Sequence, residues 1–306
     1  MTTTFNTMPT SALPRPAGRS SIIAALGVAL VLALGGCSLV KLGYGQADAI
    51  AFRWLDGYVD FDDAQSWRAR TALAEALAWH RRTQLPDYMQ LLARAEAETA
   101  ADTTPERMCA WAGEIRDRLD PILQFLAPAI TDVALSLAPA QFTRIDERFA
   151  ETNEEFRDEH LQKNTERRQR AMVRREADRA EMLYGKLDDA QRALIVESVR
   201  GSPYSAERVD AERKARQQEA LAFLRHLRES NPGRDDALLQ VRAFLRAVGQ
   251  SPREAYRIYA ERVASHNCAL ESALHNAASP TQRREAAKRL AGYRNDARAL
   301  IGEGAD

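Results

Sequence analysis

Apolar residues recur every three or four positions along most of the chain, which is the spacing of one face of an α-helix. No segment shows the strict alternation that is typical of a half-buried strand. Prolines and glycines fall between the periodic segments, where helices begin and end. We therefore predict an all-α, elongated multi-helix protein. The expected helices span about 46–58, 62–82, 85 onward, 105 onward, 121–137, 139–184, 189–200, 206–228, 235–248, 252–275 and 280–300.

The predicted buried stripes follow from the same spacing. In the first helix the stripe contains Ile50, Trp54 and Tyr58, and in the second it contains Trp67, Leu73, Leu77 and Trp79. The segment 121–137 is apolar nearly all round, which predicts a central buried helix.

The segment from Pro139 to Tyr184 predicts one long charged helix. After Pro139 it contains no proline or glycine, and Gly185 stands where a helix C-cap favours glycine. A helix over about 139–184 would measure roughly 68 Å at 1.5 Å per residue. Acids dominate its first half and bases its second, which matches the helix dipole. Because its apolar stripe is narrow, we expect it to project from the body or to pack on one side only.

The first forty residues have the layout of a lipoprotein signal peptide. Arg15 and Arg19 precede an apolar run, Ile22 to Leu34, which suits a secretory signal and is shorter than the roughly 20 residues of a membrane span. The tetrapeptide Leu34-Gly35-Gly36-Cys37 resembles the lipobox of bacterial lipoproteins, which implies cleavage before Cys37 and lipidation of its thiol. The alternative is an ordinary signal peptide, or an uncleaved anchor, with a chance cysteine.

This layout predicts the organisation of the chain and its location. We expect a signal peptide over 1–36, a lipidated linker over 37–45, a helical domain over 46–302, divided near 185 if it forms two sub-bundles, and a frayed tail over 303–306. Ser38 is not the aspartate that retains enterobacterial lipoproteins at the inner membrane, so the resemblance favours the periplasmic face of the outer membrane over the inner membrane. Buried acyl chains such as palmitate would hold the protein there.

Charge and cysteine content limit the partners and the covalent structure. After removal of 1–36 the net charge is about −2, so we expect no attraction to nucleic acid. Cys109 and Cys268 then remain, and in an oxidising periplasm they could form a disulfide. The alternative is a pair of free buried thiols, because spacing alone does not establish proximity.

Four segments open with a similar signal, and it has two interpretations. They are 61–65, 137–141, 187–191 and 278–282, each ending in glutamine. The first interpretation is a capping box, in which Asp62, Asp188 or Ser279 caps a helix and the glutamine reaches back; Ala138 fits this less well. The second is a resemblance to the Leu-Thr-x-x-Gln motif of periplasmic helical chaperones of the Spy and CpxP type, which bind unfolded clients.

A wider set of residues resembles a known family. Its densest part lies between Cys37 and Tyr88, and no motif after the long helix matches. The residues are Trp54-Leu55-Asp56-x-Tyr58, Gln65, Trp79-His80-Arg81, Leu85-Pro86-x-Tyr88, Leu137-x-x-x-Gln141 and Asn153-x-x-Phe156. Together they resemble an uncharacterised proteobacterial lipoprotein family, domain-of-unknown-function family 6279. The resemblance implies a lipidated, helical, periplasmic protein with no assigned activity.

The stretch from Trp79 to Tyr88 is the best local candidate for a contact surface. Its candidate residues are Trp79, His80, Arg81, Asp87 and Tyr88. Arg81 and Arg82 flank His80 and would lower its pKa. One interpretation is a surface that binds an anion or a peptide. The other is a packed corner between helices, with Trp79 and Tyr88 in the core.

The sequence offers no recognisable catalytic constellation. The five histidines lack metal-ligand spacing, and no nucleophile elbow, phosphate loop or dinucleotide fingerprint occurs. We expect no catalytic residues, no metal and no cofactor, and a protein that is not an enzyme. The predicted function is that of a binding, scaffold or chaperone-like envelope lipoprotein, with a protein partner or unfolded client. The alternative is a cell-wall-active enzyme such as a lytic-transglycosylase-like hydrolase.

Overall fold

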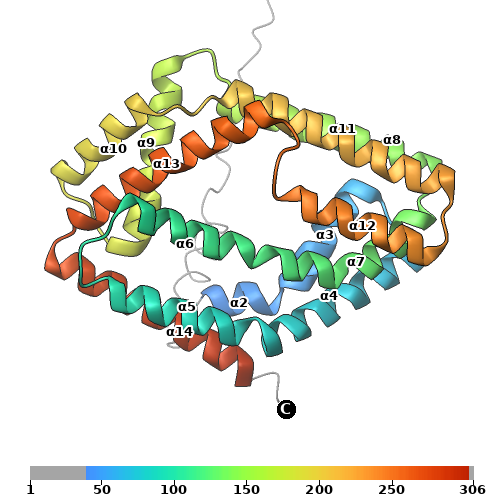
Figure 1. The fold of residues 1–306 in the computed structure, drawn as a ribbon, viewed down its shortest axis with the longest axis horizontal. Helices are drawn as coiled ribbons and strands as arrows, with labels where there is room; N and C mark the ends of the chain where they lie inside the picture. The colour runs from blue at the N-terminus through green and yellow to red at the C-terminus, as the bar shows by residue number, and fades with distance from the viewer. Residues whose placement is uncertain (1–38, 303–306) are drawn as a thin grey trace, which may run out of the picture.

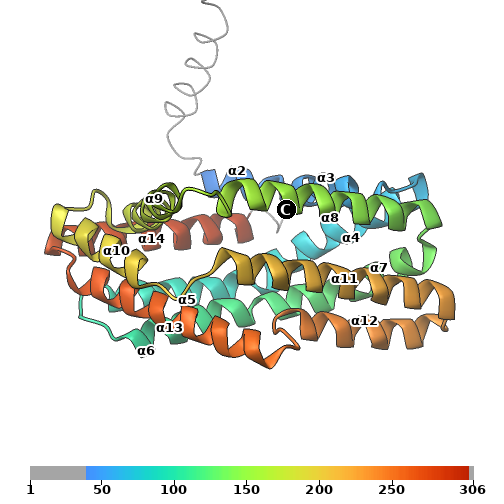
Figure 2. The same cartoon turned by 90° about the horizontal axis from the view of Figure 1, so that it is seen from above.

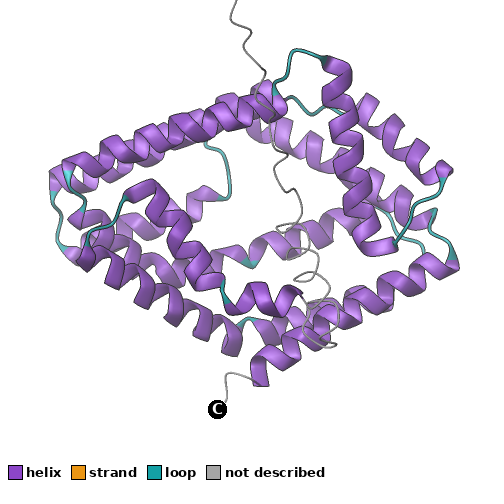
Figure 3. Ribbon diagram, turned by 180° about the vertical axis from the view of Figure 1, so that it is seen from behind, coloured by secondary structure: helices purple, strands orange, loops and turns teal. Residues whose placement is uncertain are grey.

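The computed structural model describes residues 39–302, and this region contains helices and connecting loops without any strand (Figures 1 and 3). The predicted all-α, elongated fold is confirmed. The helices are α2 (Leu39–Gly45), α3 (Ala47–Val59), α4 (Asp63–Thr83), α5 (Leu85–Glu98), α6 (Pro105–Asp117), α7 (Leu119–Ser136), α8 (Pro139–His160), α9 (Thr165–Tyr184), α10 (Asp189–Gly201), α11 (Ala206–Ser230), α12 (Arg234–Val248), α13 (Glu254–Asn276) and α14 (Pro280–Gly302).

From α3 onward, the helices divide into two sets that alternate along the chain. The first set contains the pairs α3–α4, α7–α8 and α11–α12, and the second contains α5–α6, α9–α10 and α13–α14. Within the first set, α3 packs on α4 and α8. Helix α7 packs on α4, α11 and α12, and α8 packs on α11. Within the second, α5 packs on α14, α6 on α13, and α9 and α10 on each other. Figure 1 shows the sets at opposite ends of an elongated ring of helices.

Each set has its own apolar core. In the first set, Ala127 and Ala134 of α7 pack with Leu227 of α11 and Val241 of α12. A neighbouring cluster around Leu137 joins α8 to α11. In the second set, one cluster joins α9 and α10 to the end of α13, and another joins α5 to α14 through Leu85, Ala297 and Leu300. The buried members of the first are Ala177, Leu187, Ile195, Val199 and Leu274. The small side chains on α7 let neighbouring helices approach closely, as ridges-into-grooves packing requires.

The prediction of one long helix over 139–184 is wrong. The chain forms α8, leaves the helical conformation after His160, and starts again as α9. Asn164 explains the restart, because its side-chain oxygen accepts the backbone N–H of Arg167 at 2.9 Å and so caps the new helix. The two helices belong to different sets: α8 packs on α3 and α11, whereas α9 packs on α10 and α14.

Two other expectations about organisation also change. The segment 37–45, expected as a linker, contains α2, which packs on α3 and α14. Contacts between helices cross the suggested division near 185, because α11 and α12 pack on α7 and α8 while α14 packs on α5. The tail 303–306 and the signal peptide 1–36 lie outside the described residues.

The predicted buried stripes of α3 and α4 are only partly correct. Ile50, Trp54 and Trp67 are exposed, at 50%, 62% and 68%. Phe52 takes the buried position of α3 instead, and Arg70 of α4 lies 3.5 Å over its ring. Both helices therefore carry large apolar side chains on their solvent side.

Candidate functional site

The repeated start signal forms helix caps. Asp62 accepts the backbone N–H of Gln65 at 2.8 Å, and the Gln65 side-chain oxygen accepts the backbone N–H of Asp62 at 3.1 Å. Asp188 with Gln191 and Ser279 with Gln282 form the same reciprocal box. Ala138 has no side-chain acceptor, so only one of the two capping-box hydrogen bonds forms there. In that bond the Ala138 N–H donates to the Gln141 side-chain oxygen at 2.9 Å. The capping interpretation therefore holds.

The same glutamines also join distant helices in pairs. Gln65 at the start of α4 and Gln141 at the start of α8 each donate an amide N–H to the other's side-chain oxygen, at 3.2 and 2.7 Å. Gln191 at the start of α10 and Gln282 at the start of α14 exchange the same two bonds, at 3.0 and 2.9 Å. Each helix set thus contains one glutamine pair. Gln65 and Gln191 are 1% exposed, so these two motif residues serve the interior of the fold.

The amide groups of each pair are satisfied by further acceptors. Gln65 also donates to the carbonyl oxygen of Ser136 at 3.2 Å, and Gln141 donates to that of Asp60 at 3.0 Å. In the second set, Gln191 donates to the carbonyl of Ala277 and Gln282 to that of Lys186. Sequence reasoning missed this pairing, although four copies of one motif were a signal that could have suggested two pairs.

Three of the predicted contact residues, His80, Arg81 and Tyr88, lie together at the junction of α2, α4 and α5. The Tyr44 hydroxyl lies 2.8 Å from Nδ1 of His80, and the rings of Tyr44 and Tyr88 flank that imidazole with centroids 5.7 and 5.5 Å away. Arg81 lies 5.5 Å from the Tyr44 ring centroid. The side chains of these residues contact one another, as expected for a packed corner between helices.

The remaining two predicted residues also make internal contacts. Trp79 stacks on Phe125 of α7, with centroids 4.7 Å apart. Asp87 is exposed but forms an ion pair of 2.6 Å with Arg118, which precedes α7. The structure thus divides the five residues between two places: His80, Arg81 and Tyr88 lie at the α2–α4–α5 junction, whereas Trp79 and Asp87 make contacts toward α7.

Burial sets the protonation behaviour of this corner. Desolvation by the surrounding protein lowers the pKa of His80 below its usual 6.5. The cause differs from the expected one, which was repulsion from Arg81 and Arg82. Burial also raises the pKa of the Tyr44 hydroxyl to about 12, so it stays protonated as a hydrogen-bond donor.

A second tyrosine–histidine pair fixes the other set. The Tyr184 hydroxyl lies 2.8 Å from Nδ1 of His275, whose Nε2 lies 2.8 Å from the carbonyl oxygen of Ala101. Because a carbonyl only accepts, Nε2 carries the proton, and in the neutral ring Nδ1 accepts from the tyrosine. This buried chain ties the end of α9 to α13 and to the loop before α6.

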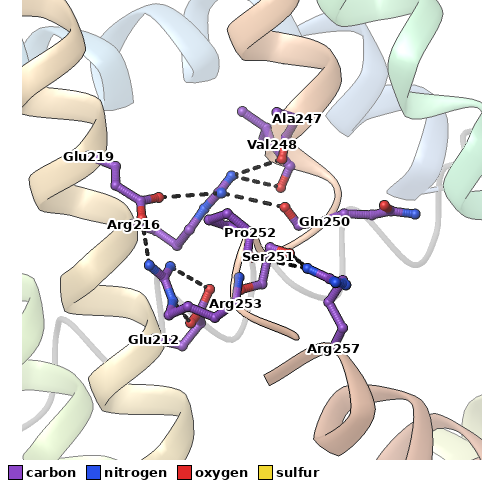
Figure 4. A network of polar contacts seen from close by, with 10 residues as sticks. All are labelled: Glu212, Arg216, Glu219, Ala247, Val248, Gln250, Ser251, Pro252, Arg253 and Arg257. Carbon is purple, nitrogen blue, oxygen red and sulfur yellow. Dashed lines mark hydrogen bonds and ion pairs between the residues drawn. The ribbon is translucent and has the colours of Figure 1, made fainter. Parts of the chain in front are cut away.

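An ion-pair network closes the connection between α12 and α13 onto α11 (Figure 4). Arg253 donates two bonds to the Glu212 carboxylate, at 2.6 and 2.8 Å, and one to Glu219 at 2.5 Å. Arg216 donates to backbone carbonyls at the C-terminus of α12, including that of Ala247 at 3.1 Å. The Arg253 guanidinium holds the pKa of Glu212 below its usual value. The network fixes the point at which the chain passes from the first set to the second.

Cys109 and Cys268 form a disulfide, with their Cα atoms 5.4 Å apart. The bond joins α6 to α13 inside the second set. Because the two cysteines lie 159 positions apart in the sequence, the bond encloses the whole of α7–α12 in one covalent loop.

One pocket bears on the enzyme alternative. It measures about 220 Å³ and lies between α9 and α13, next to the disulfide-linked α6, with Glu176, Tyr184 and Glu271 among its lining residues. Partial desolvation and the nearby Glu176 charge raise the pKa of Glu271, although its side chain as a whole is exposed. Glu176 itself is bound by Arg179 at 3.0 and 3.2 Å. Among residues 39–302 no cluster of histidine, cysteine or acidic side chains could hold a metal ion.

A shallow groove between α4 and α7 contains the most exposed tryptophan. Trp67 lines it together with Phe125, Leu126 and Pro128, and its volume is about 420 Å³. Tryptophan is usually a highly buried residue, so an exposure of 68% at the edge of an apolar groove is uncommon.

The described residues offer little that could cross a bilayer. No single helix between residues 39 and 302 has the necessary length and apolar composition, and the only pair that passes jointly, Pro105–Ser136 with Pro139–His160, is bent by 115°. Cys37, the predicted lipidation site, lies outside the described residues.

Comparison with known proteins identifies a family and nothing more specific. The sequence model of a family of unknown function, DUF6279, matches residues 57–248. The match extends beyond the long charged segment, where the sequence offered no recognisable motif, and leaves out residues 37–56. No curated protein and no solved structure matches the chain.

Proposed function

The chain belongs to the DUF6279 family of unknown function, and we propose that it is a lipid-anchored periplasmic protein that binds exposed apolar segments of other proteins. The lipid is attached at Cys37, and the location is the periplasmic face of the outer membrane. The protein acts as a scaffold or as a holder of unfolded clients and not as an enzyme. The signal-peptide layout supports the location, and the helical surface supports the binding role.

The observation that carries the binding role is Trp67 at the groove between α4 and α7. An exposed indole beside Phe125 and Leu126 can bury apolar side chains of a client, at about 25 cal/mol per Å² of apolar area removed from water. Aromatic anchors of this kind carry much of the binding energy in protein interfaces.

An aggregation assay tests this role. The chain without its signal peptide and lipid, at several-fold excess and without ATP, should suppress aggregation of a denatured client, and Trp67→Ser should weaken the suppression. Tyr293→Ser, which removes an exposed aromatic from α14, is the matched control and should leave suppression unchanged. Absence of suppression by the wild-type protein would remove the client-holding role.

A hydrolase is the second candidate, and Glu271 is the observation that favours it. Glu271 has a raised pKa and lies beside a second carboxylate, Glu176. Glycoside hydrolases use such a pair of carboxyl groups, one as general acid and the other as base or nucleophile. Incubation of purified peptidoglycan with the protein should release no soluble fragments if the binding role is correct. Release that is abolished by Glu271→Gln would instead establish the enzyme.

A further inference from the structure

The outward face of α3 carries two large apolar side chains, Ile50 and Trp54, where a solvent-facing helix is normally polar. Gln46, Ile50, Arg53 and Trp54 lie at helical spacing on that face and are all exposed. Phe52 is 3% exposed and occupies the opposite, inward face. α3 therefore carries apolar side chains in two directions, and only the inward direction is covered by protein.

The position of α3 along the chain connects this face to the proposed lipid. α2 begins at Leu39, two residues after Cys37, and two extended residues reach only about 7 Å. Gln46 alone separates α2 from α3. Figure 2 shows α2 and α3 along one side of the molecule, whereas α6, α12 and α13 lie along the opposite side. A lipid on Cys37 would therefore enter the bilayer close to the α2–α3 side.

We propose that the outward face of α3 rests on the phospholipid surface into which the Cys37 acyl chains insert. This inference rests on the proposed lipidation of Cys37. Trp54 suits the interface, where an indole buries its rings and keeps its N–H hydrated. Ile50 lies one turn away and adds apolar contact, and the long side chain of Arg53 can extend to the headgroups. The contact turns the α2–α3 side toward the membrane and the α6–α12–α13 side toward the periplasm.

Charge determines which lipid surface fits. α8 and α9 lie along the same side as α3. The exposed residues of α8 include Glu147, Glu151, Glu154 and Asp158, whereas those of α9 include Arg167, Arg170, Arg174 and Arg179. Within a Debye length of about 10 Å the acids repel anionic headgroups and the bases attract them. Because this side carries charges of both signs, the partner that fits it is a zwitterionic lipid surface, and the contact should not require anionic lipid.

Fluorescence quenching by bromine atoms in the acyl chains tests the contact. The full lipidated protein is placed in phosphatidylcholine vesicles with and without brominated lipid, and tryptophan emission is compared. Most of the quenching should disappear in Trp54→Phe and remain in Trp67→Phe, an equally exposed tryptophan in the α4–α7 groove. Ile50→Asp should reduce quenching while the protein still floats with the vesicles, and the quenching should not require phosphatidylglycerol.

The outcomes separate this inference from the lipid anchor itself. Vesicle flotation without any loss of quenching in Trp54→Phe would overturn the α3 contact and leave the anchor in place. If cells do not lipidate Cys37, a maleimide lipid coupled to that thiol still allows the same comparison, because Cys109 and Cys268 are bonded to each other. Equal quenching of the wild type and Trp54→Phe in that preparation would also overturn the inference.

Discussion

Gln65 and Gln141 begin different helices, lie 76 residues apart, and exchange both of their side-chain amide hydrogen bonds. Each glutamine also closes the cap of its own helix, so one side chain fixes a helix start and the position of a partner helix together. Gln191 and Gln282 repeat the arrangement in the second helix set. The two pairs place the starts of α4 against α8 and of α10 against α14.

Replacing Gln65 by alanine should therefore destabilise the protein by about 2–4 kcal/mol. The variant removes half of a capping box and leaves the buried amide of Gln141 without its partner, and each loss costs roughly 1–2 kcal/mol. Urea denaturation measures the change, and Gln90→Ala, at an exposed position on α5, should change stability by less than about 0.5 kcal/mol. A double-mutant cycle with Gln141→Ala should show strong coupling, and additive effects would contradict the pairing.

The disulfide should contribute strongly to stability because it closes a long loop. For a sequence separation of 159 the chain-entropy relation gives at most about 5 kcal/mol. Denaturation of the wild-type protein should shift to lower denaturant when a reductant is added. The Cys109→Ser/Cys268→Ser variant should unfold at that lower concentration and should not respond to reductant. A response in this variant would show that the effect arises elsewhere.

The corner formed by Tyr44 and His80 should make the docking of α2 sensitive to acid. The folded-state pKa of His80 is lowered, so the neutral ring is favoured in the fold and the charged ring is favoured when α2 is released. The stabilisation is complete above the ordinary pKa of 6.5 and is lost as the pH falls through the folded-state value. NMR titration of the imidazole measures the folded-state pKa of His80, and hydrogen exchange in α2 measures how firmly α2 is docked. Tyr44→Phe should reduce protection of α2 at neutral pH, and unchanged protection would contradict this role of the hydroxyl.

Arg253 should be needed to keep the α12–α13 connection on α11. Its removal leaves the largely buried carboxylate of Glu212 without a partner, so Arg253→Ala should lower the melting temperature clearly. Arg246→Ala, at an exposed position on α12, should have little effect. Because the pKa of Glu212 is lowered, its contribution is present above the ordinary value of 4.5 and is lost as the pH falls through the folded-state value. The destabilisation by Arg253→Ala should shrink in acid, and a constant difference would rule out the ion pair as its cause.

Local signals made most helix boundaries predictable. Pro105 and Pro139 mark helix starts, and the Asp62 and Asp188 caps lie where the capping-box pattern places them. The break after His160 was missed because Asn164 acts alone, without a proline or glycine nearby. In the sequence, an isolated asparagine in a charged segment is compatible both with the interior of a helix and with a helix N-cap.

The arrangement of helices in space was not predictable from one sequence. Whether successive helix pairs alternate between two sets depends on which apolar faces meet in space. Leu137 and Leu274 would be apolar core positions in the sequence whether each helix pair packed on the next pair or on a more distant one. Ile50, Trp54 and Trp67 were assigned to the core because periodicity identifies an apolar face without stating whether protein covers it. Of the candidate contact residues, His80, Arg81 and Tyr88 meet at one junction, and their partner Tyr44 lies in a segment expected to be a linker.

The anchor at Cys37 is the claim on which location and function both depend, and metabolic labelling with palmitate tests it most directly. Label should enter the wild-type protein and the Cys109→Ser/Cys268→Ser variant equally, and should be absent from Cys37→Ala. Failure of the wild type to take up label, or equal labelling of Cys37→Ala, would contradict the account.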